Sequence, residues 1–319
     1  MIFCPYTKDF TAFAKAQKLS DNIKSSGKAN ILADKFVIIT DSASDLSPER
    51  AKEYGVSLIP LTVTVEGSDS VPDTEADKKE LYAELRAKKS ATTSAINYEA
   101  ALEAIGAEVG AGNDVLYIGF SSGLSSTAST GILVCKELSE QYPDRKVYGV
   151  DSLCASLGEG LLVYLAAKKR DSGASIEEVR DYVEDTKLHL CHWFTVDDLF
   201  FLKRGGRVSA ATAVVGSMLS IKPVMHVDNE GHLINVGKAR GRKASLEALV
   251  NKMAETAIDP ASQTVFICHG DCIEDAEYTA NLIRERLGVK DIMIDYTGAV
   301  IGSHSGPGTL AIFFLGTHR

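Results

Sequence analysis

Residues 36–42 read Phe36-Val37-Ile38-Ile39-Thr40-Asp41-Ser42, a short apolar run that ends in polar side chains. A run of this length and composition predicts a buried β-strand. After it, short apolar runs alternate with stretches of helical periodicity. This alternation predicts a mostly parallel α/β sheet, with strands at 36–40, 56–65, 114–120 and 146–150 and helices at 48–54, 76–87, 97–108, 123–140 and 154–170.

The second half of the chain predicts a second α/β layer. The turn signals between Arg170 and Ser175 place a domain boundary there, which gives an N-terminal α/β domain over 36–172 and a C-terminal α/β domain over 173–319. The expected elements include a helix near 209–219 and a hairpin that joins strands 223–227 and 232–236. Residues 1–35 form an N-terminal extension that we expect to be helical.

Composition and charge restrict the class of protein. The chain has 319 residues and a formal net charge of −9, which argues against a nucleic-acid partner because such binding needs a positive field. It contains no apolar run of about 18 residues, the length that a membrane span requires. Residues 1–35 lack the continuous apolar segment of a signal peptide, so we expect a cytoplasmic protein with no transmembrane segment.

The six cysteines are scattered along the chain, which favours reduced thiols over a disulfide framework. The segments 189–192 and 268–272 contain histidine and cysteine but lack the paired spacing of a zinc site. We therefore expect no metal and no cofactor.

Hydroxyl residues gather where the predicted strands end. In an open parallel sheet these ends share one crevice, where ligands bind. The structural alternative is that each cluster only caps a helix or closes a turn. Four converging clusters favour a polar ligand site, and they lie at 40–42, 92–94, 120–127 and 151–152.

Residues 297–310 place His304 beside the turn Gly306-Pro307-Gly308, ahead of a final apolar segment. Proline is favoured in the first turn of a helix, and free N–H groups at a helix start attract anions. We therefore expect an anion site next to the imidazole, supported by Ser305, Gly306 and Gly308. The alternative is a tight turn with a bystander histidine.

A rival interpretation is a serine hydrolase. Residues Gly119-Phe120-Ser121-Ser122-Gly123 match the G-x-S-x-G nucleophile elbow and precede a histidine, as in α/β-hydrolases. Against an esterase, no HGGG-type oxyanion loop precedes the serine. The acid of the triad would have to come from Asp271, Asp291 or Asp295.

Two basic clusters, 203–209 and 238–243, stand out on this acidic chain. Neither matches a Walker or dinucleotide-binding motif. Such clusters are usually solvated surface, but they can also dock an acidic partner or a phosphorylated ligand.

Taken together, residues 40–42, 93–94, 121–125, 203–209 and 304–308 resemble the motifs of the DegV family, in the family's order. These bacterial fatty-acid-binding proteins serve as the lipid-carrying subunit of fatty acid kinase. The resemblance runs from about Phe36 to the end of the chain. It implies two α/β domains with a long-chain fatty acid in the cleft between them, and no catalytic activity of the subunit itself.

The resemblance also implies site residues. Thr93, Ser122 and His304 would bind the ligand carboxylate, supported by the loops of Ser121 and Gly123 and of residues 305–308. Arg207 and Arg240 would dock an ATP-dependent kinase that phosphorylates the bound fatty acid. One departure is that the family's Thr-Ser-Gln-Pro is here Thr93-Ser94-Ala95-Ile96.

Overall fold

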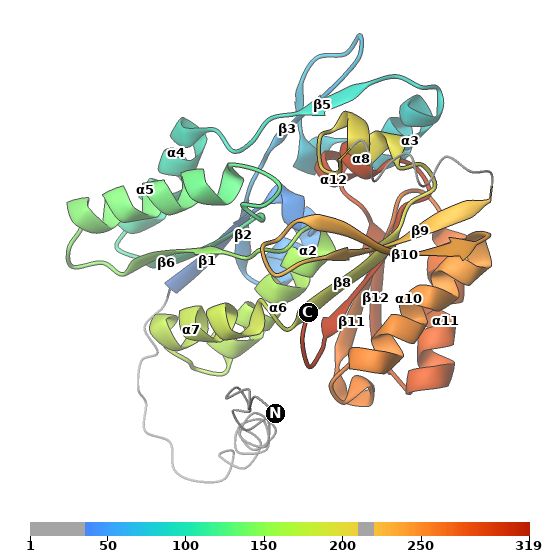
Figure 1. The fold of residues 1–319 in the computed structure, drawn as a ribbon. Coiled ribbons are helices and arrows are strands. Elements are labelled where there is room, and N and C mark those ends of the chain that lie inside the picture. Colours follow the sequence, from blue (N-terminus) through green and yellow to red (C-terminus); the bar gives the residue numbers. More distant parts are fainter. Residues whose placement is uncertain (1–35, 210–219) are drawn as a thin grey trace, which may run out of the picture. The chain divides into compact units, whose positions relative to one another are not determined.

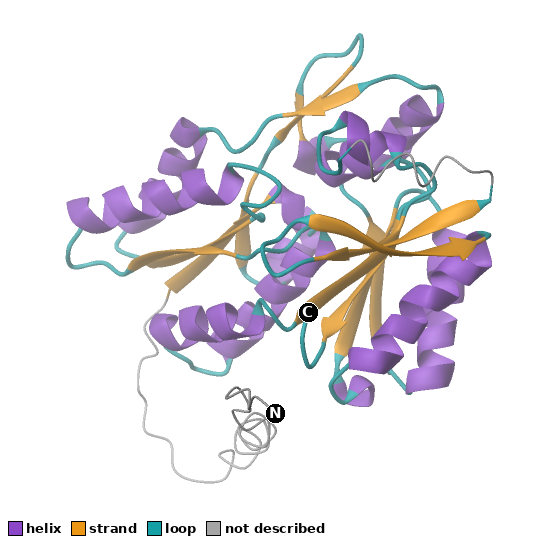
Figure 2. Ribbon diagram, in the orientation of Figure 1, coloured by secondary structure: helices purple, strands orange, loops and turns teal. Residues whose placement is uncertain are grey.

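Two large sheets and one small sheet organise the computed structural model, which describes residues 36–209 and 220–319 (Figures 1 and 2). The expected N-terminal extension at 1–35 lies outside the described residues, as does nearly all of the expected helix at 209–219. The α/β class predicted from the sequence is confirmed, with one parallel four-stranded sheet and one mixed six-stranded sheet.

The first sheet has the order β2-β1-β6-β7, and every pair in it is parallel. Because such a sheet is covered on both faces, its strands are apolar and rich in β-branched residues. The expected strand 56–65 is two strands, since the chain leaves the first sheet at Pro60, which has no N–H to donate to a ladder. The strands are β1 (Phe36–Asp41), β2 (Val56–Ile59), β6 (Asp114–Gly119) and β7 (Val147–Asp151).

Alternate side chains of β1 point to opposite faces of this sheet. Ile39 lies in a core cluster with the helices α4 (Tyr98–Gly110) and α5 (Thr127–Gln141). Ile38 lies in another cluster with α6 (Leu157–Asp171) and α7 (Ile176–Thr186). The sheet is therefore the middle of a three-layer arrangement, as the alternation of strands and helices predicts.

The second sheet has the order β10-β9-β8-β13-β11-β12, and of its pairs only β11 with β12 is parallel. The helices α10 (Arg242–Thr256) and α11 (Ile273–Leu287) pack on one face. The expected hairpin is confirmed as β9 and β10. The strands are β8 (Leu190–Thr195), β9 (Ile221–Val227), β10 (Leu233–Arg240), β11 (Thr264–His269), β12 (Asp291–Tyr296) and β13 (Leu310–Leu315).

A small antiparallel sheet, β4-β3-β5, completes the described fold. The short helix α12 (Ala299–Ser305) contacts α3, β3, β5 and α8. The remaining elements are β3 (Thr62–Val65), β4 (Val71–Pro72), β5 (Ala91–Thr93), α2 (Pro48–Glu53), α3 (Lys78–Arg86), α8 (Phe200–Arg204) and the 3₁₀ turns η2 (Ser42–Ser44), η3 (Asp73–Glu75) and η4 (Pro260–Ser262).

Helix α6 packs against both large sheets, contacting β1 on one side and β8, β11 and β13 on the other. Two glycines in its first turn make this close approach possible. A Cβ at Gly158 would overlap the ring of His192, and a Cβ at Gly160 would lie 2.7 Å from the carbonyl oxygen of Ser44. The first turn of α6 is therefore packed closely between the two sheets.

Residues 34–319 form one compact unit. One hydrophobic core cluster contains Leu116 of the first sheet and Phe266 of the second, with Leu161 of α6 between them. The expected boundary between 172 and 173 follows α6 in the chain and stays a prediction. None of the described helices combines the length and hydrophobicity needed to span a lipid bilayer.

We expect Gly158→Ala to destabilise the protein by about 1–3 kcal/mol, because the added methyl group would overpack the contact with His192. Gly110→Ala is the matched control, since Gly110 also lies in a helix but has open space at its Cβ position. It should leave the free energy of unfolding unchanged or raise it by up to about 1 kcal/mol. Urea unfolding measures both, and equal effects would contradict the role assigned to Gly158.

Candidate functional site

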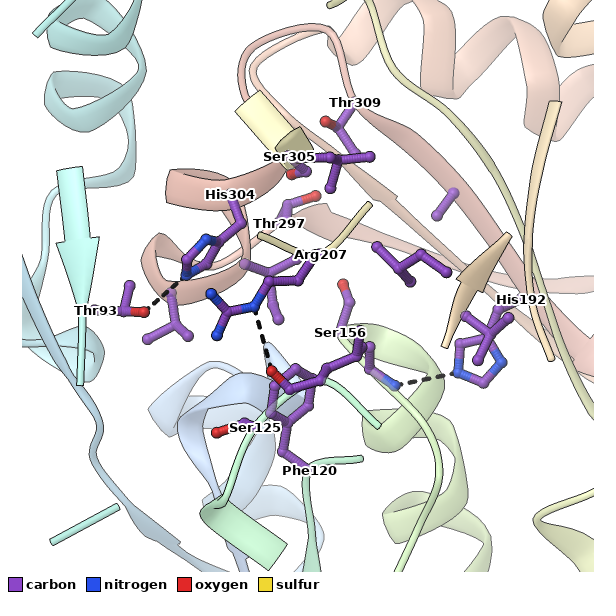
Figure 3. A pocket seen from close by; sticks show the side chains of 18 of the residues that line it. Thr93, Phe120, Ser125, Ser156, His192, Arg207, Thr297, His304, Ser305 and Thr309 are labelled. Atoms are coloured by element: carbon purple, nitrogen blue, oxygen red, sulfur yellow. Dashed lines mark hydrogen bonds between the residues drawn. The ribbon is translucent and has the colours of Figure 1, made fainter. Parts of the chain in front are cut away.

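A cavity of about 210 Å³ lies between the strand ends of the first sheet and the inner face of the second (Figure 3). Most of its lining surface is apolar, and hydroxyl groups, two histidines and one arginine also face it. The polar lining residues are Thr93, Ser94, Ser125, Ser126, Ser156, His192, Arg207, Thr297, His304, Ser305 and Thr309, and the larger apolar ones are Leu61, Phe120, Leu124, Phe194, Leu202, Val227, Leu233, Val300, Ile301 and Phe313. An apolar cavity with few convergent polar groups is the usual form of a small-molecule site.

Thr93 and His304 meet at one end of this cavity, as the resemblance implied (Figure 3). Thr93 is the last residue of β5, and His304 lies in the last turn of α12. The distance from Thr93 Oγ1 to His304 Nε2 is 2.8 Å, and both side chains are half-buried. Two residues 211 positions apart in the sequence thus form one hydrogen-bonded pair that faces an apolar space.

Burial, together with the nearby positive charges of Arg207 and Arg204, lowers the pKa of His304 to about 4. The imidazole is therefore neutral at pH 7. The backbone at Gly205 fits closely beside Nδ1, where a Cβ would overlap the ring. With the ring held in this place, Nε2 and the Thr93 hydroxyl can both face a ligand.

Arg207 lines the cavity near His304 and is half-buried, so it does not lie freely on the surface. Its Nε donates to the carbonyl oxygen of Leu124 at 3.2 Å, and another of its N–H groups donates to the carbonyl of Gly205. Burial lowers its pKa from the usual value. Arg240, the last residue of β10, is exposed and outside the cavity lining. The two arginines that we expected to dock a partner thus occupy different environments.

Ser122 is exposed and does not line the cavity, whereas Ser125 and Ser126 of the same turn do. The backbone N–H of Ser122 donates to Asp151 Oδ1 at 3.1 Å. Ser125 belongs to the predicted hydroxyl cluster 120–127 but was not expected to contact the carboxylate, and its hydroxyl lies 2.8 Å from that of Thr127. The reason is the turn: the N–H groups of Leu124 and Ser125 both donate to the carbonyl of Ser121, which delays the start of α5 from the expected residue 123 to Thr127.

The elbow serine Ser121 is fully buried. Its hydroxyl donates to the carbonyl oxygen of Gly231 at 3.0 Å and accepts the N–H of Gly123 at 3.2 Å. No histidine among the described residues is hydrogen-bonded to it. A nucleophile elbow needs an exposed hydroxyl beside a base, so the geometry gives no support to the esterase alternative.

The expected helix start at Pro307 is wrong. Helix α12 ends before the turn, at Ser305, and the apolar segment after the turn is the strand β13. Gly306 and Gly308 have φ of 79° and 78°, and their N–H groups donate to the carbonyls of Gly302 and Gly270. The turn therefore supplies no free N–H groups to an anion, because positive φ reverses the chain here instead of opening a helix.

Ser305 is buried and lines the cavity, and its hydroxyl has no hydrogen-bond partner among the described residues. It is the residue of the expected 305–308 loop that faces the site. Figure 3 places Ser305 with Thr309 on the side of the cavity that lies above His304 in this view.

Two of the four hydroxyl clusters serve the fold instead of the cavity. Asp41 accepts hydrogen bonds from the N–H groups of Phe120 and Ala43 and from the hydroxyl of Tyr117. Asp151 accepts the N–H groups of Ser122 and Leu153. These clusters fix the turns at the strand ends, as the structural alternative predicted. Residues 93–94 and 125–126 of the other two clusters line the cavity.

Three buried carboxyl groups lie behind this end of the first sheet. Burial raises the pKa of Asp41 to about 6 and raises those of Asp45 and Glu159 well above their usual value. Asp45 accepts a hydrogen bond from Ser156, which lines the cavity, and Glu159 accepts one from Thr40 at 2.8 Å. Of the three, only Asp41 falls in a hydroxyl cluster that was expected to face the ligand, the one at 40–42.

No group of His, Cys, Asp and Glu side chains in the described ranges is placed to hold a metal ion. Within 189–192 and 268–272, His192 accepts the N–H of Ala155, and the thiol of Cys272 donates to the carbonyl of Thr309. In these contacts the histidine and the cysteine bind backbone groups of the fold.

Comparison with known proteins agrees with the fold. Residues 35–317 match the model of the DegV family of uncharacterised proteins, and the chain belongs to this family. A DegV domain-containing protein of Clostridium perfringens is 46% identical over 284 residues, which cover 88% of this chain and 98% of that protein.

Two solved structures extend the comparison. A Thermotoga maritima protein, reported to reveal a fatty acid binding function, is 30% identical with a TM-score of 0.75, over 88% of this chain and 98% of its own. DegV of Bacillus subtilis, reported as a fatty acid binding protein, is 29% identical with a TM-score of 0.73, over 87% and 98%.

We expect the ring of His304 to titrate with a midpoint near pH 4 in lipid-free protein, measured by NMR of the imidazole. Arg207→Gln should raise this pKa because it removes a nearby positive charge. Arg240→Gln is the control and should leave the pKa unchanged, since Arg240 is not among the groups that shift it. An equal response to both variants would contradict the electrostatic assignment.

The same shift predicts a pH dependence of stability. The pKa of His304 is about 4 when folded, against 6.5 for an ordinary histidine, so between these values the unfolded chain binds more protons. The stability contribution of neutral His304 is thus complete above pH 6.5 and is lost as pH falls toward 4. Urea unfolding of wild type and His304→Gln at pH 7.5 and 5 should show the wild type losing more stability on acidification.

Proposed function

We propose that this protein binds a long-chain fatty acid in the cavity, with the carboxylate at Thr93 and His304 and the acyl chain along the apolar walls. The 2.8 Å contact between Thr93 and His304 at the end of an apolar cavity carries this proposal. The related proteins of Thermotoga maritima and Bacillus subtilis, reported to bind fatty acids, support it.

The charges near the cavity suit a carboxylate. Arg207 and Arg204 lie close enough to His304 to lower its pKa, so the head end of the cavity is electropositive on a chain of net charge −9. A bound carboxylate would oppose these positive charges and raise the pKa of His304. The neutral ring can meet the ligand as a hydrogen-bond donor through Nε2, beside the Thr93 hydroxyl.

The acyl chain would provide most of the affinity. At about 0.8 kcal/mol per buried CH₂ group, roughly 14 methylenes contribute on the order of 11 kcal/mol before the entropic cost of binding. A hydrogen bond to the charged carboxylate contributes about 1.5–3 kcal/mol. The head group thus mainly fixes the orientation of the ligand.

We assign the third carboxylate contact, expected at Ser122, to Ser125. Ser125 lines the cavity and lies just before the N-terminus of the 15-residue helix α5, where partial positive charge favours an anion. Ser122 faces solvent. Both serines belong to the turn that resembles the family motif, so either assignment uses the same loop.

We further propose that an ATP-dependent kinase phosphorylates the bound carboxylate. A carboxylate is itself a nucleophile, so this protein needs no general base, and phosphoryl transfer depends chiefly on positioning and on a metal that the kinase would supply. The exposed Arg240 suits docking of an acidic partner surface. Arg207, half-buried beside the head group, would orient the carboxylate toward the kinase.

Freshly purified protein should carry a fatty acid, because burial of the acyl chain against the apolar walls makes binding tight. Mass spectrometry of the denatured sample detects it. Protein that is consistently empty and takes up no added palmitate would refute the proposed function, and turnover of a p-nitrophenyl ester that is lost in Ser121→Ala would favour the hydrolase instead.

The two serines give a matched test of the head-group assignment. Ser125→Ala should weaken palmitate binding by about tenfold, the loss of one hydrogen bond to a charged group. Ser122→Ala removes the same hydroxyl from the same turn and should stay within about twofold of wild type. Competition with a fluorescent fatty acid measures both. A larger loss of palmitate affinity in Ser122→Ala than in Ser125→Ala would instead support Ser122 as the third contact.

Kinase-dependent formation of acyl phosphate should separate binding from presentation. His304→Ala should reduce this formation more than it reduces lipid uptake, since the acyl chain supplies most of the affinity. Arg240→Ala should weaken the response to the kinase, most clearly at low salt where the docking charge is least screened, with lipid content unchanged. Equal losses of uptake and of product in His304→Ala would contradict this division of roles.

A further inference from the structure

The N-terminus of α12 receives its cap from a distant part of the chain. Helix α12 has seven residues and begins after Gly298, which has no side chain to cap it. Asp73 Oδ1 accepts the N–H of Ala299 at 2.7 Å and the N–H of Val300 at 3.2 Å. Asp73 lies in η3 and is 5% exposed, so this carboxylate is directed inward at the helix start.

The segment that carries Asp73 also belongs to the small sheet that carries Thr93. In this sheet β3 lies between β4 and β5, with Thr62 paired to Pro72 and Val63 paired to Thr93. The N–H of Asp73 donates to the carbonyl of Leu61 at 2.9 Å. One small sheet therefore holds Thr93 directly and holds His304 through the cap on α12.

The other contacts of α12 confine its sides but do not satisfy these N–H groups. The hydroxyl of Tyr82 donates to the carbonyl of Thr297 at 3.0 Å, and its ring packs against Gly302, where a Cβ would overlap it. Gly205 packs against the ring of His304. Asp73 is therefore the acceptor for the N–H groups of Ala299 and Val300.

We propose that Asp73 is a positioning residue for the carboxylate site: by capping α12 it sets the place of His304 relative to Thr93. This inference rests on the proposed function for its effect on ligand binding, whereas its effect on His304 is independent of any ligand. A buried cap that accepts two N–H groups and complements the helix dipole is worth more than an ordinary surface cap.

The test compares three variants of lipid-free protein by NMR of the His304 imidazole. Asp73→Ala removes the acceptor and should shift the ring signals and the pKa of His304. Asp73→Asn keeps an oxygen that can accept both N–H groups, so it should retain the wild-type signals. Ser175→Ala is the control: Ser175 caps α7 by accepting the N–H of Glu178 at 3.2 Å, and α7 packs against α6, β6 and β7.

Palmitate affinity gives the second readout. Asp73→Ala should bind about fivefold or more weakly, while Asp73→Asn and Ser175→Ala stay within about twofold of wild type. In a His304→Ala background, Asp73→Ala should cause no further loss, because Asp73 acts through His304. Thermal unfolding of each variant confirms that folded protein is being compared.

Two results would overturn the proposal: unchanged His304 signals in folded Asp73→Ala, or the same loss of affinity with and without His304. If Asp73→Ala does not fold, the test rests on Asp73→Asn. This variant keeps an oxygen that can accept the two N–H groups, so displaced His304 signals in the folded variant would contradict the proposal. If no variant and no wild-type sample binds palmitate, the proposed function fails, but the NMR comparison still tests the placement of His304.

Discussion

The close packing of α6 between the two large sheets is the constraint on which the rest of the structure depends. Gly158 and Gly160 remove the side chains that would otherwise hold the sheets apart, so the ring of His192 and the carbonyl of Ser44 contact the helix backbone. The first turn of α6 then lies at the junction of the sheets, and Ser156 at its start lines the cavity. The position of the cavity follows from this junction.

The buried carboxyl groups at this junction hold the fold together and do not line the cavity. Asp41 ties the end of β1 to the start of the 120–126 turn through the N–H of Phe120, and Glu159 ties α6 to β1 through Thr40. Burial raises the pKa of Glu159 well above its usual value, which favours its protonated form. It raises the pKa of Asp41 only to about 6, so Asp41 stays largely ionised at pH 7, where it accepts three hydrogen bonds. The charged groups that shift the pKa of His304 are arginines, which favour an anionic head group.

The sequence predicted what depends on periodicity and missed what depends on the exact course of a turn. Alternating runs predicted the α/β class and most helices and strands, and the pairing of Thr93 with His304 came from the family resemblance. The turn after β6 shifted the facing serine from Ser122 to Ser125, because two N–H groups share the carbonyl of Ser121. The helix start predicted at Pro307 is wrong, because the flanking glycines have positive φ and the chain continues into the strand β13.

The small sheet explains why a short helix can carry a functional histidine. A seven-residue helix is marginal alone, because few of its backbone groups pair within it, so tertiary contacts must hold it in place. Here Asp73 satisfies its first N–H groups, Tyr82 packs on its side, and Gly205 fits against the ring of His304. Because Asp73 and Thr93 flank the same strand, one small sheet holds both partners of the Thr93–His304 contact.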